Sequence, residues 1–399
     1  MRYNGSTQIE IEEQGYKHID KYICADCLKN EYLKSWLENH EQAEVMECDY
    51  CGKETLCIPM DTYVEKFLEA IHFYYIENDK SDNPWDSEEK EFLYKVSSLY
   101  EVLGDFVELY HYAPLDDLLT HIHCDGWCKK DPLSLTENER KMYSWQRFSD
   151  IVKYHNRYCF YTDMGDKHNE YYSAQDILST FAEDVKNPNL NLIKTIPAGT
   201  SFYRARNVNE EDLKNLTDST LGAPPCDKAA ANRMSAEGIS VFYCADKVNT
   251  AVKEIISGVY QNIVIAEFKN KKELKYLDLS SIKKLKLFDI FDTANHDLRE
   301  LILFYNALNN ELSKTIKDRE KLEYVPTQIF AEYFNIIEGL DGIKYISAKD
   351  KNSDCIVLFF DNEQCTNKTD PILCTNKCVL EMVNYKILKK SEVKNLLES

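Results

Sequence analysis

The chain has 399 residues, of which 44% are hydrophobic and 29% are charged, and its formal net charge is −20. This composition is typical of two or three globular domains, and the 12 glycines and 10 prolines are too few for long disordered linkers. The negative charge repels phosphate backbones and argues against broad electrostatic binding of nucleic acid. A local group of arginines can still bind a small anion, because salt screens charges beyond about 8–10 Å.

The first residues, MRYNGSTQIEIEEQ, are polar and acidic and lack the apolar core of a secretion signal. We also find no uninterrupted apolar run near the roughly 18 residues that a membrane-spanning helix needs. The 14 cysteines therefore indicate reduced thiols and metal ligands, not a disulfide framework. We expect a cytoplasmic protein with no membrane partner, and the sequence leaves open whether it forms a homo-oligomer.

Two CxxC pairs lie near the N-terminus, Cys24-Ala-Asp-Cys27 and Cys48-Asp-Tyr-Cys51, with twenty residues between them. Two residues between thiolates let both reach one tetrahedral ion from a tight turn, so two such pairs predict a structural Zn²⁺ site. Such a closed site has no open position for a substrate, so we expect it to hold structure. Buried free thiols and a redox pair are the alternatives.

Residues 59–190 are expected to be mostly helical, because apolar side chains recur with helical spacing over 67–75 and over 92–103. Arg147 and His155, in the stretch SWQRFSDIVKYHNRYCFY, allow two interpretations. They belong either to a nucleotide site of a helical RNase or to an aromatic packing helix with a solvated basic face. Their separation is longer than the RNase spacing, which favours packing.

The pattern changes after the loop signal Lys186-Asn187-Pro188. From there we predict strands at 201–204, 240–244, 262–268, 342–348 and 355–361, a helix at 250–256 capped by Asn249, and helices at 296–312 and 327–338. The fold class is therefore α+β, with a zinc-knuckle and helical region before a mixed α/β domain. The expected domains are a zinc module at 1–58, a helical domain at 59–190 and a final domain at 191–399.

Four residues in the final domain suggest a binding site: Arg204, Arg233, Tyr243 and Glu254. Arginines hold phosphates by bidentate, charge-assisted hydrogen bonds, and a tyrosine ring can stack on a base. A carboxylate stabilises positive charge that develops on a sugar. The set is suited to a pyrophosphate-containing ligand with a cationic sugar.

These residues carry a resemblance to a known family. Residues 202–254 and 324–360 resemble the RES domain, with Tyr203-Arg204, Asn232-Arg233, Phe242-Tyr243 and Glu254 in the family's order. The late serine is matched by Ser347, and Tyr324–Gln328 resembles the segment before the helix that precedes it. The first 190 residues resemble the zinc-bearing helical extension of larger RES proteins.

The resemblance implies a fold like that of ADP-ribosyltransferases and a toxin that consumes NAD⁺ at the nicotinamide–ribose bond. It implies catalytic roles for Glu254, Arg204 and Tyr243, and NAD⁺-binding roles for Arg204, Arg233, Tyr243 and Ser347. The expected activity is that of an NAD⁺ glycohydrolase or phosphorylase acting as a toxin or in anti-phage defence.

Two other functions stay open from the sequence. One is an ADP-ribosyltransferase that modifies a macromolecule with the same site, and the other is an RNase or binding protein centred on the helical domain. We see no DNA-binding antitoxin segment in the chain. A toxin of this kind would be controlled by a separate antitoxin or activating partner. The acceptor of the ADP-ribosyl group is not readable from the sequence.

Overall fold

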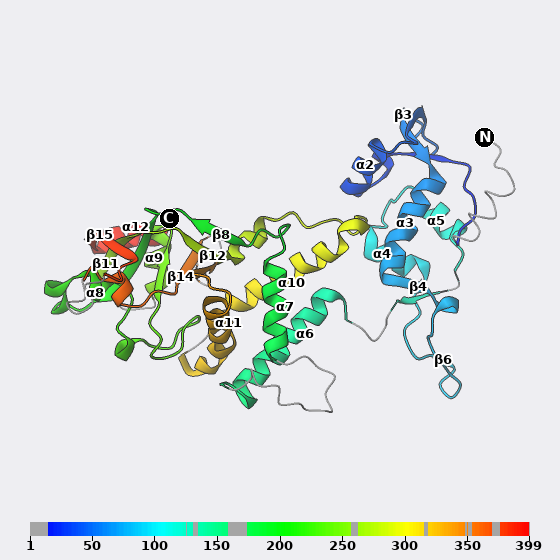
Figure 1. The fold of residues 1–399 in the computed structure, drawn as a ribbon. Coiled ribbons are helices and arrows are strands. Elements are labelled where there is room, and N and C mark those ends of the chain that lie inside the picture. The colour runs from blue at the N-terminus through cyan, green and yellow to red at the C-terminus, as the bar shows by residue number, and fades with distance from the viewer. Residues whose placement is uncertain are drawn as a thin grey trace. The chain divides into compact units, whose positions relative to one another are not determined.

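In the computed structural model, the chain divides into two compact units, Met1–Glu137 with Leu287–Glu300, and Asn138–Lys286 with Leu301–Ser399 (Figure 1). The residues described are 15–124, 126–130, 135–158, 174–256, 262–314, 318–347, 349, 353–368 and 376–398. The three-domain division expected from the sequence stays a prediction. None of the helices in these ranges combines the length and apolar character needed to cross a membrane.

The first unit begins with a small antiparallel sheet of order β1-β3-β2. Its strands are β1 (Tyr22–Cys24), β2 (Glu44–Glu47) and β3 (Glu54–Pro59), and the helices of this unit are α2 (Glu31–Glu38), α3 (Met60–Tyr74), α4 (Leu99–Phe106) and α5 (Leu115–His121). Helix α3 buries Tyr63, Phe67 and Ile71, which follow one another at intervals of four residues. This face joins the core of the unit together with Phe291, from the second segment of the unit.

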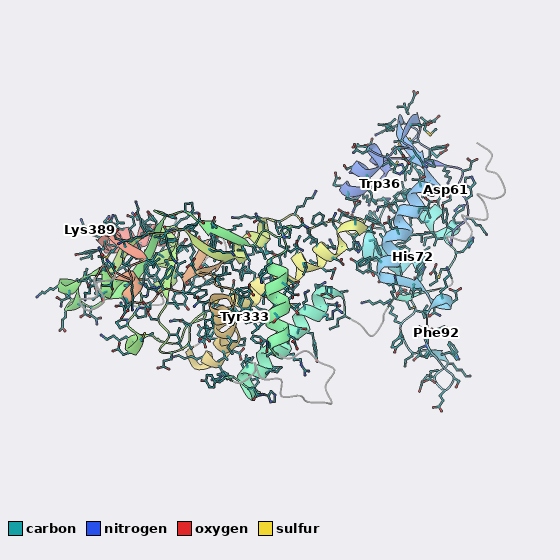
Figure 2. All side chains as sticks on the ribbon, viewed as in Figure 1. Trp36, Asp61, His72, Phe92, Tyr333 and Lys389 are labelled. Atoms are coloured by element: carbon teal, nitrogen blue, oxygen red, sulfur yellow. The ribbon has the colours of Figure 1, made fainter. Side chains whose placement is uncertain are left out.

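Two short strand pairs complete the first unit. Strand β4 (Tyr75–Glu77) pairs with β7 (Trp127–Lys129), and β5 (Trp85–Asp86) pairs with β6 (Glu91–Phe92). The prediction of one helix over 92–103 is therefore wrong at its start, because Phe92 belongs to the hairpin (Figure 2). The helix begins at Leu99, where Ser98 and Glu101 form a capping box that fixes its N-terminus.

The described part of the second unit contains an eight-stranded mixed sheet of order β15-β11-β9-β10-β14-β13-β12-β8. Its strands are β8 (Ile193–Ile196), β9 (Ser201–Val208), β10 (Phe242–Ala245), β11 (Asn262–Asn270), β12 (Leu274–Asp278), β13 (Gly342–Ile346), β14 (Asp354–Leu358) and β15 (Leu380–Leu388). Neighbours run antiparallel except β12 and β13. Strands β9 and β10 are registered at a single pair, Tyr203 with Ala245, so the sheet opens beside that pair.

The two faces of this sheet bury different side chains. One face holds an apolar cluster that includes Phe202, Phe242 and Phe268. The other face is covered by α9 (Val248–Ile255) and α12 (Lys390–Glu398), which pack Val252 and Val393 against it (Figure 1). Because side chains alternate along a strand, neighbouring residues of β9 and β10 belong to different faces.

A layer of helices completes the second unit. It contains α6 (Glu137–Asp150), α7 (Ala174–Val185), α11 (Val325–Ile336) and the later part of α10 (His296–Leu312), and a short helix α8 (Asp218–Leu221) lies beside the sheet's apolar cluster. Trp145 of α6 packs against Phe181 of α7 and Phe330 of α11. Trp145 and Phe148 are both buried. This confirms the packing interpretation of the aromatic side chains in the WQRF stretch, while His155 is exposed.

Candidate functional site

The C-terminal turn of α9 brings Glu254 to the end of strand β13, where Ser347 follows the last strand residue. The Ser347 hydroxyl donates a hydrogen bond to Oε1 of Glu254, although the two residues are 93 positions apart in the sequence. Ser347 is only 1% exposed and Glu254 is partly exposed, so the contact is partly buried. The fold therefore joins two of the residues that the sequence proposed for one site.

Two further residues complete this corner of the sheet, and the sequence reasoning missed both. Tyr345 of β13 is paired with Cys355 of β14, and both are buried on the face that α9 covers. Burial and the nearby Glu254 carboxylate raise the pKa of the Cys355 thiol, and burial holds the pKa of Tyr345 well above its usual range. Both groups are therefore neutral at pH 7. Strand alternation alone could have placed Tyr345 on the face of Ser347.

Tyr243 lies in β10 on the same face as this corner. Its hydroxyl accepts a hydrogen bond from the Met234 backbone N–H at 3.0 Å and lies 3.2 Å from the Ser235 hydroxyl. Burial raises the pKa of Tyr243 to about 12, so the group stays a neutral phenol. Its hydroxyl holds the loop that contains Arg233, which links two of the proposed substrate-binding residues.

Arg233 is held by the C-terminal end of α10. One guanidinium nitrogen, Nη1, donates to the Leu312 carbonyl, and Nη2 donates to the Lys314 carbonyl at 2.6 Å. Carbonyl groups at a helix end have no partner within the helix, so a guanidinium is a suitable donor for them. Arg233 is therefore oriented by contacts to the backbone in this structure.

The segment Tyr324–Gln328, which the sequence linked to the family pattern, supports the backbone of the same loop. The Thr327 hydroxyl donates to the Arg233 carbonyl. The Gln328 amide donates to the carbonyls of Asn232 at 2.8 Å and Ser235 at 3.1 Å. This segment thus fixes the arginine loop by hydrogen bonds made from the first turn of α11.

Arg204 lies on the opposite face of the sheet from Glu254. Its guanidinium lies 5.3 Å from the centre of the Phe242 ring, and Nη1 donates to the Tyr243 carbonyl at 2.5 Å. Because β9 and β10 separate beside this point, the side chain bridges the opening between them. Burial lowers the pKa of Arg204, and its buried Nε has no hydrogen-bond partner among the described residues.

Arg206 shares the face of Arg204 and has a structural role at the end of α8. Its Nη2 donates to the Gly222 carbonyl at 2.5 Å, and its Nε donates to the Leu221 carbonyl at 3.4 Å. Burial, together with the neighbouring charge of Arg204, lowers the pKa of Arg206 to about 9. The structure therefore brings together Glu254, Ser347, Tyr243 and the Arg233 loop, and it separates both β9 arginines from them by the sheet.

The four N-terminal cysteines form one cluster. Their sulfur atoms lie within 4.8 Å of one another, with separations of 3.7 Å for Cys24–Cys27, 3.6 Å for Cys24–Cys51 and 3.7 Å for Cys27–Cys48. A tetrahedral ion with metal–sulfur bonds of about 2.3 Å requires sulfur–sulfur separations of about 3.8 Å. The donor set therefore fits a tetrahedral, thiolate-bound metal.

The backbone around Cys48 also favours a thiolate. Burial opposes the ionisation of Cys48, but hydrogen bonds from the backbone N–H groups of Tyr50, Cys51 and Cys24 outweigh it and lower its pKa to about 7. Two further cysteines, Cys124 and Cys128, lie four residues apart in the sequence. Their thiols donate to carbonyls, Cys124 to that of Gly126 and Cys128 to that of Ile76. In the part of the chain that the structure describes, the N-terminal set is the metal-like cluster.

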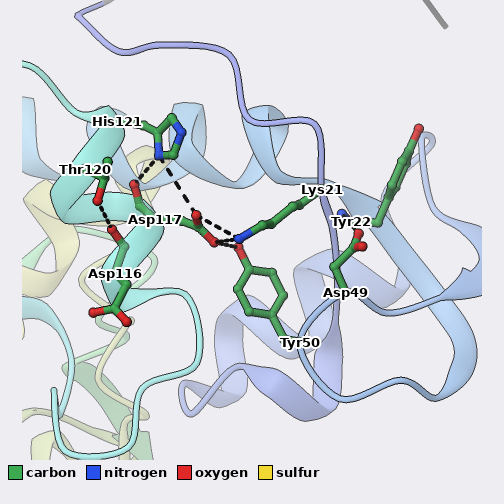
Figure 3. Close-up of polar contacts among 8 residues, drawn as sticks. All are labelled: Lys21, Tyr22, Asp49, Tyr50, Asp116, Asp117, Thr120 and His121. Atoms are coloured by element: carbon green, nitrogen blue, oxygen red, sulfur yellow. Dashed lines mark hydrogen bonds and ion pairs between the residues drawn. The ribbon is translucent and has the colours of Figure 1, made fainter.

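The second CxxC pair, Cys48-Asp-Tyr-Cys51, forms a knuckle that Tyr50 connects to helix α5 (Figure 3). The Tyr50 hydroxyl donates to Oδ2 of Asp117 at 2.6 Å, and Lys21 Nζ contacts the same carboxylate at 2.7 and 2.9 Å. Burial acts to raise the pKa of Asp117, but Lys21 and Tyr50 outweigh it and lower the pKa. The carboxylate therefore stays charged and joins the knuckle to the helical part of the first unit.

We expect Tyr50→Phe to destabilise the first unit by about 1–2 kcal/mol, because a hydrogen bond to a charged, partly buried carboxylate is lost. Thermal or urea unfolding of the purified chain measures the change. Tyr100→Phe is the matched control, since Tyr100 is 53% exposed. Equal unfolding midpoints for the two variants would show that the Tyr50–Asp117 contact adds no stability.

Comparison with known families identifies both parts of the chain. The family described as "HEPN/RES N-terminal domain 1" matches residues 41–166, and the family described as "RES domain" matches residues 201–375. The C-terminal part of the chain therefore contains a RES domain, which follows a region similar to the N-terminal domain of RES proteins. The RES match spans Arg204, Arg233, Tyr243, Glu254 and Ser347, so every residue proposed for the site lies inside it.

No curated protein matches the chain significantly. A solved structure with partial similarity is the crystal structure of the M. tuberculosis MbcT–MbcA toxin–antitoxin complex. It is 13% identical, covers 54% of this chain and 98% of that chain, and has a TM-score of 0.33. That score is too low for the likeness to establish the fold, so the RES domain is assigned from the match of residues 201–375.

Proposed function

We propose that the RES domain of this chain binds NAD⁺ and breaks its nicotinamide–ribose bond. The observation that supports this most directly is the contact between Glu254 and Ser347, which come from distant parts of the chain and meet in a buried corner. A partly buried carboxylate oriented by a buried hydroxyl is suited to stabilising positive charge on a sugar. The match of residues 201–375 to the RES domain supports the same substrate.

The proposed reaction needs little proton transfer at the leaving group. When the bond between ribose and nicotinamide breaks, its electron pair goes to the pyridine nitrogen, and neutral nicotinamide departs. The ribose is left as an oxocarbenium-like cation, which the Glu254 carboxylate stabilises. An oxygen nucleophile then bonds to the sugar and gives up its proton, completing the substitution.

The remaining residues have binding and positioning roles in this proposal. Arg233 contacts the pyrophosphate when its guanidinium exchanges a backbone carbonyl for a phosphate oxygen, a charge-assisted bond that is stronger than the neutral one. Tyr243 keeps the Arg233 loop in place through its hydroxyl. Arg204, on the opposite face of the sheet, has a supporting role in this proposal, because its hydrogen bond to the Tyr243 carbonyl joins β9 to β10.

The product distinguishes the reactions that this site could perform. Purified chain is incubated with NAD⁺, with and without inorganic phosphate, and the products are separated by chromatography. Free ADP-ribose indicates hydrolysis, a phosphate-dependent ADP-ribose phosphate indicates phosphorolysis, and label transferred to a macromolecule indicates an ADP-ribosyltransferase. NAD⁺ that stays intact under all three conditions contradicts the proposal.

NAD⁺ consumption in a cell is harmful without control, so we propose that the chain acts as a toxin restrained by a separate antitoxin or triggered by an activating partner. Growth arrest on expression that depends on Glu254 would support this role. A chain whose expression leaves growth and cellular NAD⁺ unchanged would contradict it, unless a co-expressed partner accounts for the restraint.

We also propose that the ion held by Cys24, Cys27, Cys48 and Cys51 is Zn²⁺ with a structural role. Four thiolates at tetrahedral spacing are the ligand set that zinc prefers, and they leave no coordination position for a substrate. The ion would hold the two knuckles together, and Tyr50 would connect them to Asp117.

A further inference from the structure

Lys349 closes a ring of hydrogen bonds around the carboxylate of Glu254. Its side-chain Nζ donates to the Glu254 carbonyl at 2.6 Å and to the Ile256 carbonyl at 3.0 Å. Its backbone N–H donates to the Ser347 hydroxyl at 3.1 Å, and that hydroxyl donates to Oε1 of Glu254. One residue therefore contacts both the backbone of Glu254 and the group that orients its side chain.

The end of α9 needs such a partner for a physical reason. The last carbonyls of a helix find no N–H donor within the helix. Helix α9 ends at Ile255, and its C-cap residue is not a glycine. With eight residues, the helix is too short to be stable on its own, and its last turn is the part that frays. A lysine ammonium at this end satisfies two carbonyls and interacts favourably with the helix dipole.

We propose that Lys349 is a positioning residue that fixes the last turn of α9 and thereby aims the Glu254 carboxylate at the substrate. This inference rests on the function proposed for Glu254 and adds a residue outside the family pattern of arginines, glutamate and serine. Lys349 is exposed and acts through Glu254 and Ser347. Its loss should therefore affect the chemical step more than substrate binding.

Lys349→Met is expected to lower kcat for NAD⁺ consumption about tenfold with KM nearly unchanged, because the lost contacts orient a group that acts in the transition state. Lys349→Arg keeps a cation and hydrogen-bond donors at the helix end and should retain most of the activity. Lys386→Met is the matched control, since it removes an exposed lysine that pairs with Glu392 in the same unit.

Hydrogen exchange of the α9 amides tests the positioning without any enzymatic assay. Exchange in Val252–Ile256 should be faster in Lys349→Met than in the unmodified chain, Lys349→Arg and Lys386→Met. Unchanged exchange would overturn the inference even if the chain consumes no NAD⁺, so this result is separate from failure of the proposed function.

A double variant separates positioning from a general loss of folding. In a Glu254→Gln background, Lys349→Met should cause no further fall in kcat, because the negative charge that Lys349 positions is already absent. The same tenfold fall in both backgrounds would contradict a role through Glu254. Full activity of Lys349→Met in a chain that depends on Glu254 would also contradict it.

Discussion

Glu254→Gln is expected to lower the rate of NAD⁺ consumption by about two to three orders of magnitude, the usual cost of removing one electrostatic stabiliser of a transition state. Glutamine has nearly the same shape and can still accept a hydrogen bond from Ser347, so the fold should be kept. The loss then reports the missing negative charge. Nicotinamide release, followed by chromatography, measures it.

Two further variants test the same expectation. Glu210→Gln, which removes an exposed carboxylate from the same unit, should leave the rate unchanged. Ser347→Ala should have a smaller effect than Glu254→Gln, because it removes only one contact of the carboxylate. If Glu254→Gln consumes NAD⁺ as fast as the unmodified chain, the assignment of the site is wrong.

Removing the metal from the cysteine cluster is expected to unfold the first unit. Structural zinc sites contribute about 10–16 kcal/mol of binding free energy at neutral pH, which is as large as the whole stability of an ordinary domain, about 5–15 kcal/mol. A strong chelator or Cys48→Ser should therefore abolish the cooperative unfolding of that unit. Calorimetry measures the unfolding of the unit, and the metal content of the purified chain shows whether the ion is bound.

Cys226→Ser is the control for the cysteine change, because Cys226 is exposed and lies outside the cluster. It should unfold like the unmodified chain and keep its metal. A chain that contains no metal as purified, or one whose melting is unaffected by chelation, would contradict a structural zinc ion. Hydrogen exchange in α3, which packs beside the knuckle sheet in the same core, localises the unfolding.

The sequence predicted several elements closely. Helix α10 has the bounds 296–312 that were expected, and α11 begins beside Pro326 as its position suggested. The central strands β9, β10, β11, β13 and β14 were each predicted within a few residues. These signals are local, since they depend on apolar periodicity and on proline, which act over a few residues.

Other predictions, of a helix cap and of the set of strands, were wrong or incomplete. Asn249 was expected to cap α9, but Lys247 is the N-cap residue and the helix begins at Val248. Three sheet strands, β8, β12 and β15, were not predicted. Strand β15 lies at the sheet edge, and most of its residues are exposed although Val383–Ile387 alternates apolar and polar residues.

By itself the sequence determined the residue types of the proposed site and of the metal cluster, because the CxxC spacing and the family pattern are recognised within short segments of the chain. Only the tertiary structure decided which of them meet. Ser347 reaches Glu254 across 93 residues, Tyr345 and Cys355 join them through strand register, and Arg204 lies on the opposite face. Strand pairing and the side of a sheet depend on long-range contacts, which no local pattern in one sequence records.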